Sequence, residues 1–470
     1  MTITKVKSYN KNTLFYKMLF TITLPIVLQS LITSSLNMLD TMMIGKVGEV
    51  ELASVGIANQ YYFLFTLFIL GISGGGGVLA AQLFGKKDLT NIKKTLTKSL
   101  TIGLGISLFI TAFGVFMPEK IMSLFSTDPS VISVGSIYLR ITVLSYCFTA
   151  ISFTFSAFLR SIGNTKLPML ASLFALIING FLNYILIFGY LGMPQLGTVG
   201  AAIATLISRT CECLIILGFV YFKDKVLNIS FSDFSNFPKQ LSKTLTSITM
   251  PIVLNEACWG LGNVTYIAIY ARINTAAAAS MQICSTIMNL FMIFAFGLSY
   301  ASVVIIGNEI GAGNEDAAKE HSKRIAGVSI MIALVMSVIL LFSAKPIVSF
   351  FNVSDVVKTS SVYILCIFSL IMIIKVFNMV MIVGIFRGGG DAAYWSILQG
   401  LTLWCVGIPL AYFAAFKLSF PIHYVVAFTA VEEILKLIFV VKRFYSYKWI
   451  RNIVKDTPTH LETAFVEKTA

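Results

Sequence analysis

The chain alternates long apolar runs with short polar breaks. The segments "TIGLGISLFITAFGVFM" (101–117) and "VSIMIALVMSVILLFSA" (328–344) are typical, and apolar runs of about 20 residues are long enough to span a membrane as helices. Charged or Gly/Pro/Asn-rich segments separate such runs. We therefore predict an all-α polytopic membrane protein with twelve transmembrane helices, at residues 15–44, 54–82, 97–117, 131–158, 167–190, 198–221, 243–270, 279–306, 325–344, 358–385, 394–416 and 422–441.

The two halves of the chain repeat one another. "TLPIVLQS" (23–30) returns as "TMPIVLNE" (249–256), residues 71–88 align with 297–314, and 155–166 align with 382–393. Six spans per half bring both halves into the membrane from the same side, as parallel repeats that flank a central substrate path. The domains predicted from this are a tail at 1–14, an N-lobe with helices 1–6 at 15–221, a linker at 222–242, a C-lobe with helices 7–12 at 243–441, and a tail at 442–470.

Charge fixes the expected orientation. Charged residues make up 12% of the chain and hydrophobic residues 57%, whereas soluble domains carry about 25% charged residues. Lysine and arginine gather in cytoplasmic loops, and with a cytoplasmic N-terminus most of them lie inside, as in the run from Lys86 to Lys98. We expect a multi-pass protein in the bilayer of the cell membrane, with both termini cytoplasmic. The net charge of +14 follows from this topology, and its dispersal over many loops argues against nucleic-acid binding.

Two prolines occupy equivalent places inside predicted spans. Pro25 and Pro251 each lie about ten residues into a helix, where proline removes a backbone hydrogen bond and kinks the helix. Prolines are tolerated in membrane helices without a functional reason, but the symmetric placement favours a shared bend.

Polar groups converge in the first half of the chain. Asp40 lies near the outer end of the first span, and Asn183 and Thr205 lie about 10 Å below that surface. Asn179 is one turn deeper than Asn183 on the same helix face. One carboxylate with neutral oxygens suits a proton or a hard monovalent cation, although such amides and hydroxyls also serve simply to hold helices together. Beyond Na⁺ at Asp40, we predict no metal and no cofactor.

The second half places its acid elsewhere. Glu256 lies near the midplane where the first half has Ser30, and the counterpart of Asp40 is Tyr266. Lys375, also near mid-depth, either forms an ion pair with Glu256 or leaves it free as a cation site, because an intramembrane charge needs a partner or a function.

Other membrane charges have ordinary explanations. Arg209 and Glu212 can neutralise each other, as can Lys436 with Glu432 or Glu433, since residues three or four apart share a helix face; Arg140 has no obvious partner. The three histidines lie in or near loops and no nucleophile motif is present, so we predict that the protein is not an enzyme.

The motifs together resemble one family. "LPIVLQSLITSSLNMLDTMMIG" (24–45), "GAAIATLISR" (200–209), "FLRSIGNTKLP" and "FRGGGD" are similar to segments of multidrug and toxic compound extrusion (MATE) transporters. The resemblance implies two six-helix bundles in a V around a central cavity. It also implies export of lipophilic, often cationic, compounds in exchange for H⁺ or Na⁺.

The resemblance also carries residue roles. Asp40 matches the acid of the first helix that couples to cations, Asn179 and Thr205 match other members of that site, and Asn183 stands where many relatives have a second aspartate. Glu256 resembles the seventh-helix glutamate of NorM-like members, whereas Lys375 stands where their tenth helix often has an aspartate. The chain thus mixes NorM-like and DinF-like features. The residues expected to line the cavity are Gln29, Asn37, Glu256, Trp259, Gln282 and Lys375, with aromatic and methionine side chains supplying adaptable contacts.

The function expected from the sequence is a monomeric secondary antiporter that exports drugs or organic cations against H⁺ or Na⁺. The alternative is a flippase of lipid-linked saccharides, which related transporters resemble. A cationic cavity would favour the flippase, and Lys375, Arg140 and Arg272 keep this alternative open.

Overall fold

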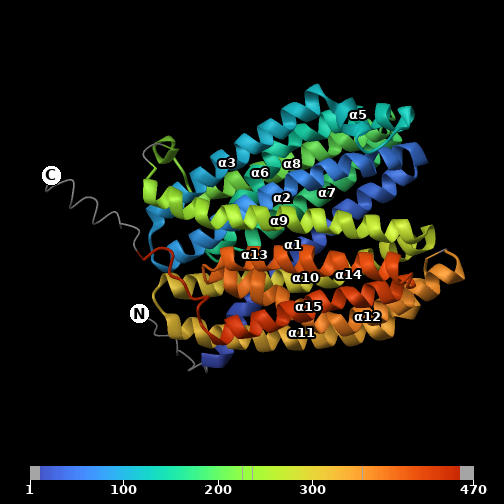
Figure 1. Cartoon of the computed structure of the whole chain (residues 1–470). Helices are drawn as coiled ribbons and strands as arrows, with labels where there is room; N and C mark the ends of the chain where they lie inside the picture. The colour runs from blue at the N-terminus through green and yellow to red at the C-terminus, as the bar shows by residue number, and fades with distance from the viewer. Residues whose placement is uncertain (1–10, 225, 235–236, 352, 456–470) are drawn as a thin grey trace.

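The computed structural model describes residues 11–224, 226–234, 237–351 and 353–455. These residues form long helices joined by short turns, as an all-α polytopic chain requires (Figure 1). Residues 1–10 of the predicted N-terminal tail, residues 225, 235 and 236 of the predicted linker, and residues 456–470 of the C-terminal tail lie outside the described part. The helices of the first half are α1 (Lys11–Gly45), α2 (Glu49–Gly85), α3 (Leu89–Phe116), α4 (Pro118–Ser123), α5 (Pro129–Thr142), η1 (Val143–Ser145), α6 (Tyr146–Ser161), α7 (Lys166–Phe188) and α8 (Thr198–Lys223).

The second half follows a short 3₁₀ helix, η2 (Phe231–Phe234). Its helices are α9 (Lys239–Ile273), α10 (Thr275–Gly311), α11 (Glu315–Ser349), α12 (Asp355–Met379), η3 (Val380–Phe386), α13 (Ala392–Thr402), η4 (Leu403–Gly407), α14 (Ile408–Tyr412), η5 (Phe413–Lys417) and α15 (Ile422–Tyr445). Two of these, η3 and η4, are π-helical turns within otherwise continuous helices, and η5 is a π-helical turn at the end of one. The hydrophobic pattern did not predict these π-helical turns, which are often found at functional sites.

The described helices account for the predicted spans. Ten continuous helical segments are long and apolar enough to cross a membrane. The other two predicted spans fall on α9 and α15, which are also long. α15 differs from the ten by carrying three charged residues, Glu432, Glu433 and Lys436, within its apolar stretch. The chain is a multi-pass membrane protein.

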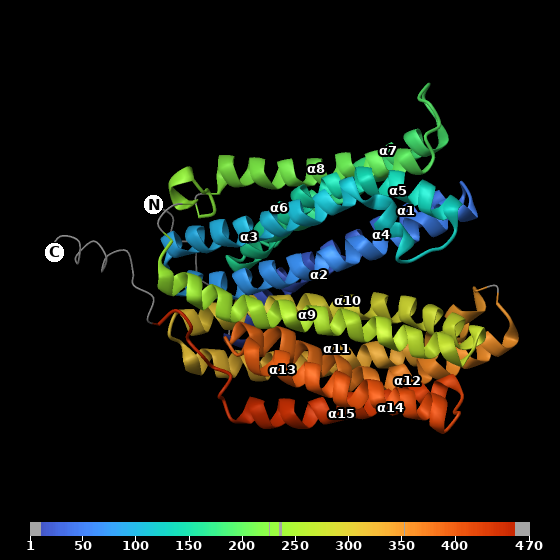
Figure 2. The same cartoon turned by 45° about the horizontal axis from the view of Figure 1, so that its top comes forward.

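The first helix of each half reaches into the other half. Figures 1 and 2 show α2–α8 on one side and α10–α15 on the other, with α9 along the boundary. α1 packs against α7 of the first half and α10 of the second. Phe15 and Ile26 of α1 are buried in the core of the second half, whereas Leu241 and Ile252 of α9 are buried in a core of the first half. We call α1–α8 the N-bundle and α9–α15 the C-bundle.

The bundles meet through glycines at equivalent positions. A Cβ on Gly85 of α2 would lie 2.0 Å from the carbonyl oxygen of Asn308, and a Cβ on Gly311 of α10 would lie 1.9 Å from that of Gln82. Gly311 and Asn308 are the repeat counterparts of Gly85 and Gln82, because residues 71–88 align with 297–314. The repeated segments therefore contact one another, and α2 and α10 approach each other through equivalent residues. We call the end of the molecule where they do so the inner end, which the sequence predicts to be cytoplasmic.

The segment after α15 crosses between the bundles at the inner end. In this segment, residues 447–454, Trp449 is buried in the C-bundle core and Val454 in an N-bundle core. Gln82 of α2 donates to the Arg451 carbonyl at 3.2 Å and accepts from the Ile453 backbone N–H at 3.0 Å. The fully buried Asp391 pairs with Arg451 at 3.2 Å. We call residues 447–454 the strap, because they tie the two bundles together.

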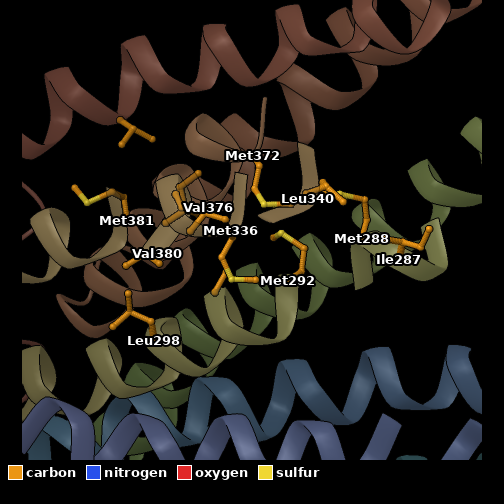
Figure 3. Close-up of a cluster of buried hydrophobic side chains, with 14 of the residues drawn as sticks. Ile287, Met288, Met292, Leu298, Met336, Leu340, Met372, Val376, Val380 and Met381 are labelled. Carbon is orange, nitrogen blue, oxygen red and sulfur yellow. The ribbon is translucent and has the colours of Figure 1, made fainter. Parts of the chain in front are cut away.

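Methionines fill the core of the C-bundle. Met288, Met292, Met336, Met372 and Met381 come from α10, α11, α12 and η3 and gather in one buried cluster (Figure 3). A flexible thioether fits irregular gaps between helices. These five methionines therefore pack between helices, which is the role that the sequence favoured for any single methionine, and contact of other methionines with substrate stays a prediction.

Candidate functional site

Asp40 lies in a buried cluster of amides. It accepts a short hydrogen bond from the Asn183 side-chain amide, and Asn183 in turn donates to Asn179 Oδ1 at 3.0 Å. Asn179 reaches Ser208 Oγ of α8 at 3.5 Å. Both asparagines are fully buried, and Asp40 is partly buried. The structure thus brings α1, α7 and α8 together at Asp40, as the depth of these residues predicted.

Two buried oxygens on the helices of this cluster lack a hydrogen-bond partner among the described residues. Asn183 Oδ1 and Thr205 Oγ1 are enclosed without a hydrogen bond, although buried polar atoms are almost always paired. Hard cations take oxygen ligands, so these two atoms together with the Asp40 carboxylate fit Na⁺ by donor type. In the described part of the chain, no group of three or more His, Cys, Asp or Glu side chains gathers as a metal centre.

The charges around Asp40 do not balance. Arg209 of α8 lies close enough to attract Asp40 electrostatically, but its guanidinium donates to Glu212 at 3.0 Å, with both side chains less than a tenth exposed. With both carboxylates ionised, Asp40, Arg209 and Glu212 carry one negative charge in excess. A buried net charge is costly in a membrane, so the cluster favours an added monovalent cation.

A chain of hydrogen bonds leads from Glu212 toward the inner end. Ser172 Oγ donates to Glu212 Oε1 at 2.7 Å, and Gln29 Nε2 donates to Ser172 Oγ at 3.3 Å. Arg160 Nη1 donates to the carbonyl oxygen of the Gln29 side chain at 3.3 Å. Gln29 lies one turn after Pro25 on α1, so the polar chain passes beside the proline.

Arg160 meets the other bundle. Its guanidinium lies 5.3 Å over the ring of Tyr300 in α10, and Tyr300 is also near Arg387 and Glu256. Arg387 donates to Glu256 Oε1 at 2.8 Å. Arg160 and Arg387 are repeat counterparts in the aligned motifs "FLRSIGN" and "IFRGGGD". Neither arginine was predicted as a site residue, although the alignment of these two motifs was the signal that could have found both.

The Glu256–Lys375 ion pair is not formed, because Arg387 occupies the position beside Glu256. Lys375 lies instead within electrostatic range of Glu433. Arg387 reaches Glu256 because η3 lies close to α9. The depth of each residue in the membrane, which is all that the sequence indicates, does not reveal this proximity. Arg140 has a partner after all: it pairs with Glu119 at 3.3 Å, and both side chains are more than half exposed.

The residues expected to line the cavity differ in accessibility. Asn37, Trp259 and Gln282 are exposed, whereas Gln29, Glu256 and Lys375 are partly buried. Their contact with substrate stays a prediction. Pro25 and Pro251 both lie inside continuous helices, as predicted, and the bend expected of them also stays a prediction.

The C-bundle has its own ionic cluster. Lys436 of α15 contacts Glu432 at 2.5 Å and Glu433 at 3.3 Å, which confirms the predicted neutralisation within one helix. Tyr266 of α9 donates to the free oxygen of Glu432 at 2.9 Å, and Asn378 of α12 donates to Glu433 at 2.9 Å. Arg209 and Glu212 likewise pair as predicted.

Comparison with known proteins places the chain among transporters. The family model MatE matches residues 25–185 and again residues 251–413, so one model fits both repeats. The "Uncharacterized transporter YisQ" of Bacillus subtilis is 25% identical over 92% of this chain and 95% of its own length. The "Probable multidrug resistance protein NorM" of Bacillus licheniformis is 26% identical over 85% of this chain and 88% of its own.

A solved structure has the same fold. The crystal structure of the MATE transporter VcmN of Vibrio cholerae, in a mutant form, superposes with a TM-score of 0.86. The two sequences are 18% identical, and the match covers 94% of this chain and 98% of that one. The all-helical, polytopic fold predicted from the sequence is confirmed.

Proposed function

The chain belongs to the MATE family of membrane transporters, and from this premise we propose that it is an antiporter, not an enzyme. It exports lipophilic, often cationic, compounds in exchange for H⁺ or Na⁺. Relatives that match most of the chain are named probable multidrug resistance proteins, which supports drug-like substrates.

The observation that carries the proposal is a partly buried Asp40 whose neighbouring arginine already pairs with another carboxylate. The carboxylate is held by Asn183, and the nearby Arg209 is already paired with Glu212. An entering cation neutralises the cluster, and its departure restores the charge. Such a site can drive transport only if the two states of the protein bind the cation differently.

The polar chain supplies a route by which the cation affects the bundles. Neutralising Asp40 changes the field on Arg209 and hence the Arg209–Glu212 pair. Glu212 is linked through Ser172 and Gln29 to Arg160, which lies against Tyr300 of the other bundle. In the proposed cycle, cation binding loosens the contact between the bundles and releases drug to the outside.

The test is transport by purified protein in liposomes. Ethidium movement is followed under a sodium gradient and, separately, under a pH gradient, for wild type and Asp40→Asn side by side. Asp40→Asn keeps the size of the side chain, so the variant should fold as wild type does. Gradient-driven transport should fall at least about 100-fold, because removing one charge-stabilised ion site costs about 3 kcal/mol or more.

The gradient that drives wild-type transport identifies the ion. Normal ethidium transport by well-folded Asp40→Asn protein would disprove the coupling role of Asp40. A surface variant, Glu119→Gln, removes an exposed carboxylate that pairs with Arg140 and should transport as wild type does.

One observation favours the flippase as the second candidate. Arg160 is in none of the ion pairs between described residues, and its guanidinium hydrogen-bonds a neutral amide. An unpaired guanidinium is suited to a phosphate. Absence of ethidium transport under both gradients, together with movement of a lipid-linked saccharide, would favour this alternative.

A further inference from the structure

We propose that the strap, together with Lys455, binds anionic phospholipid headgroups of the leaflet at the inner end, and that these lipids favour a state in which this end is open. The binding groups are the side chains of Lys448, Arg451 and Lys455. The partner is a headgroup with a net negative charge on its phosphodiester, as in phosphatidylglycerol. The proposal goes beyond the proposed function, because it involves neither a drug nor a coupling cation.

The strap presents one basic face. Of residues 447–455, the exposed ones are Lys448, Arg451 and Lys455, and all three are basic. Trp449 and Val454 are fully buried, one in the core of each bundle. The apolar side chains of this segment thus pack against the bundles, whereas its charged side chains are accessible from outside.

The chain around the strap carries charge of one sign. The last turn of α15 contains Lys442 and Arg443, so five basic residues fall within residues 442–455, and no Asp or Glu occurs from residue 434 to residue 455. Lys323 of α11 adds a positive charge 5.9 Å from the ring centre of Tyr447 in the strap. Clusters of about four to eight Lys and Arg beside the inner end of a membrane helix attract anionic lipids. The charge pattern therefore favours an anionic headgroup as the partner.

The strap is held to the bundles by its backbone, which leaves basic side chains available. Gln82 binds two backbone groups of the strap, and the Arg451 backbone N–H donates to the Gly389 carbonyl at 2.8 Å. The ammonium groups of Lys448 and Lys455 take part in no hydrogen bond, ion pair or ring contact with another described residue. Both can therefore bind a lipid phosphate without breaking a contact that holds the strap.

The docked strap lies where the two bundles meet (Figure 1). Gln82 and Lys86 of α2 bind it on one side, and its Asn452 donates to the Ile310 carbonyl of α10 on the other. Lipids surround the bundles, so the basic side chains reach the headgroups more fully once the strap leaves this central contact.

Arg451 adds to the difference between the docked and the released strap. In the structure its guanidinium pairs with the buried Asp391 at 3.2 Å, and Asp391 also pairs with Arg443 at 2.7 Å. Release of the strap frees Arg451 for a lipid phosphate, while Arg443 still compensates Asp391. A ligand shifts an equilibrium only by binding one state more tightly. Anionic lipid therefore favours the released strap, and with it the separation of α2 from α10.

The test compares purified full-length protein in nanodiscs of phosphatidylcholine with the same protein in nanodiscs that also contain phosphatidylglycerol. Spin labels on Lys87→Cys and Ala312→Cys, both exposed at the inner end, report the distance between α2 and α10, in a protein whose native cysteines are replaced by serine. One basic side chain near an anionic surface is worth about a fivefold change in an equilibrium, so phosphatidylglycerol should raise the ratio of open to closed protein at least about 25-fold.

The variant Lys448→Gln/Lys455→Gln removes two charges of the basic face and leaves the contacts between the strap and the bundles in place. Its response to phosphatidylglycerol should be no more than about fivefold, from Arg451 alone. The matched control is Lys239→Gln/Lys243→Gln, which removes two exposed lysines of α9 at the same end of the molecule. This control should respond to phosphatidylglycerol as wild type does.

The proposal fails if the wild-type distance distribution is the same in both kinds of nanodisc. It also fails if Lys448→Gln/Lys455→Gln, shown to be folded by thermal unfolding, responds as fully as wild type, or if the α9 control loses the response to the same extent. These measurements need no drug and no ion gradient, so a negative result leaves the role of Asp40 untouched.

Discussion

Glu256 and Arg387 join α9 to the end of η3 by a partly buried ion pair. The two side chains are 20% and 11% exposed, and the donor–acceptor distance is 2.8 Å. Each side chain is thus mostly removed from water and depends on the other for compensation. In the N-bundle the equivalent arginine, Arg160, makes a hydrogen bond to the neutral Gln29 in place of an ion pair. The two bundles therefore use their equivalent arginines differently.

We predict that either single change, Glu256→Gln or Arg387→Gln, lowers the free energy of unfolding by about 3 kcal/mol, because it leaves one buried charge unpaired. The charge-swapped protein, Glu256→Arg with Arg387→Glu, should recover most of this loss. Thermal unfolding of the three variants in one detergent provides the measurement. A swapped protein less stable than both single variants would argue against the pair as a stabilising contact.

At the scale of elements, the approach of α2 to α10 depends on the lack of a side chain at two positions. A Cβ atom added to Gly85 or to Gly311 would lie about 2 Å from a backbone oxygen of the other helix, which is too close for any side chain. Backbone cannot move aside as a flexible side chain can. A larger residue at either position must therefore push the helices apart.

We predict that Gly85→Val and Gly311→Val each lower stability by about 1–3 kcal/mol, the usual cost of overpacking, and open the inner end. Gly105 of α3 has no atom within 4 Å of a Cβ added there, so Gly105→Val is the matched control and should behave as wild type. The measurement is thermal unfolding combined with the reactivity of a cysteine placed at the inner end. Equal behaviour of all three variants would contradict the close contact.

At the scale of the whole molecule, the strap holds the bundles together at the inner end. Gln82 of α2 binds the strap through both ends of its amide, and Asn452 of the strap donates to the Ile310 carbonyl of α10 at 3.0 Å. Lys86 of α2 adds a contact to the Val454 carbonyl at 2.8 Å. In the proposed export cycle this end opens to load substrate, so these bonds would break in each turnover.

We predict that Gln82→Ala shifts the protein toward a state open at the inner end. The substitution removes three hydrogen bonds that the Gln82 side chain makes, two to the strap and one to the Gly388 carbonyl. Each bond is worth about 1 kcal/mol, so the population of the open state should rise at least about tenfold. Spin labels on Lys87→Cys and Ala312→Cys, both exposed at the inner end, report the distance between α2 and α10. An unchanged distance distribution in Gln82→Ala would show that the strap does not restrain the bundles.

The sequence by itself determined the class of fold and part of the site. Apolar runs fix helices across a membrane because the bilayer leaves the backbone no other way to satisfy its hydrogen bonds, and the repeats fix two equivalent halves. Helical depth was enough to place Asp40 with Asn183 and Asn179, because depth along a straight helix follows from residue number. The local pairs Arg209–Glu212 and Lys436–Glu432 were predictable because their spacing fits one helix face.

Tertiary structure alone decided the contacts between helices far apart in the chain. Arg387, not Lys375, reached Glu256, because that choice depends on how η3 lies against α9 and on the rotation of each helix about its axis. The same holds for the meeting of Tyr266 with Glu432 and for the strap across both bundles. Hydrophobic periodicity says which residues are in the membrane, but every helix there has several neighbours. Only side-chain packing selects which of them meets a given polar group.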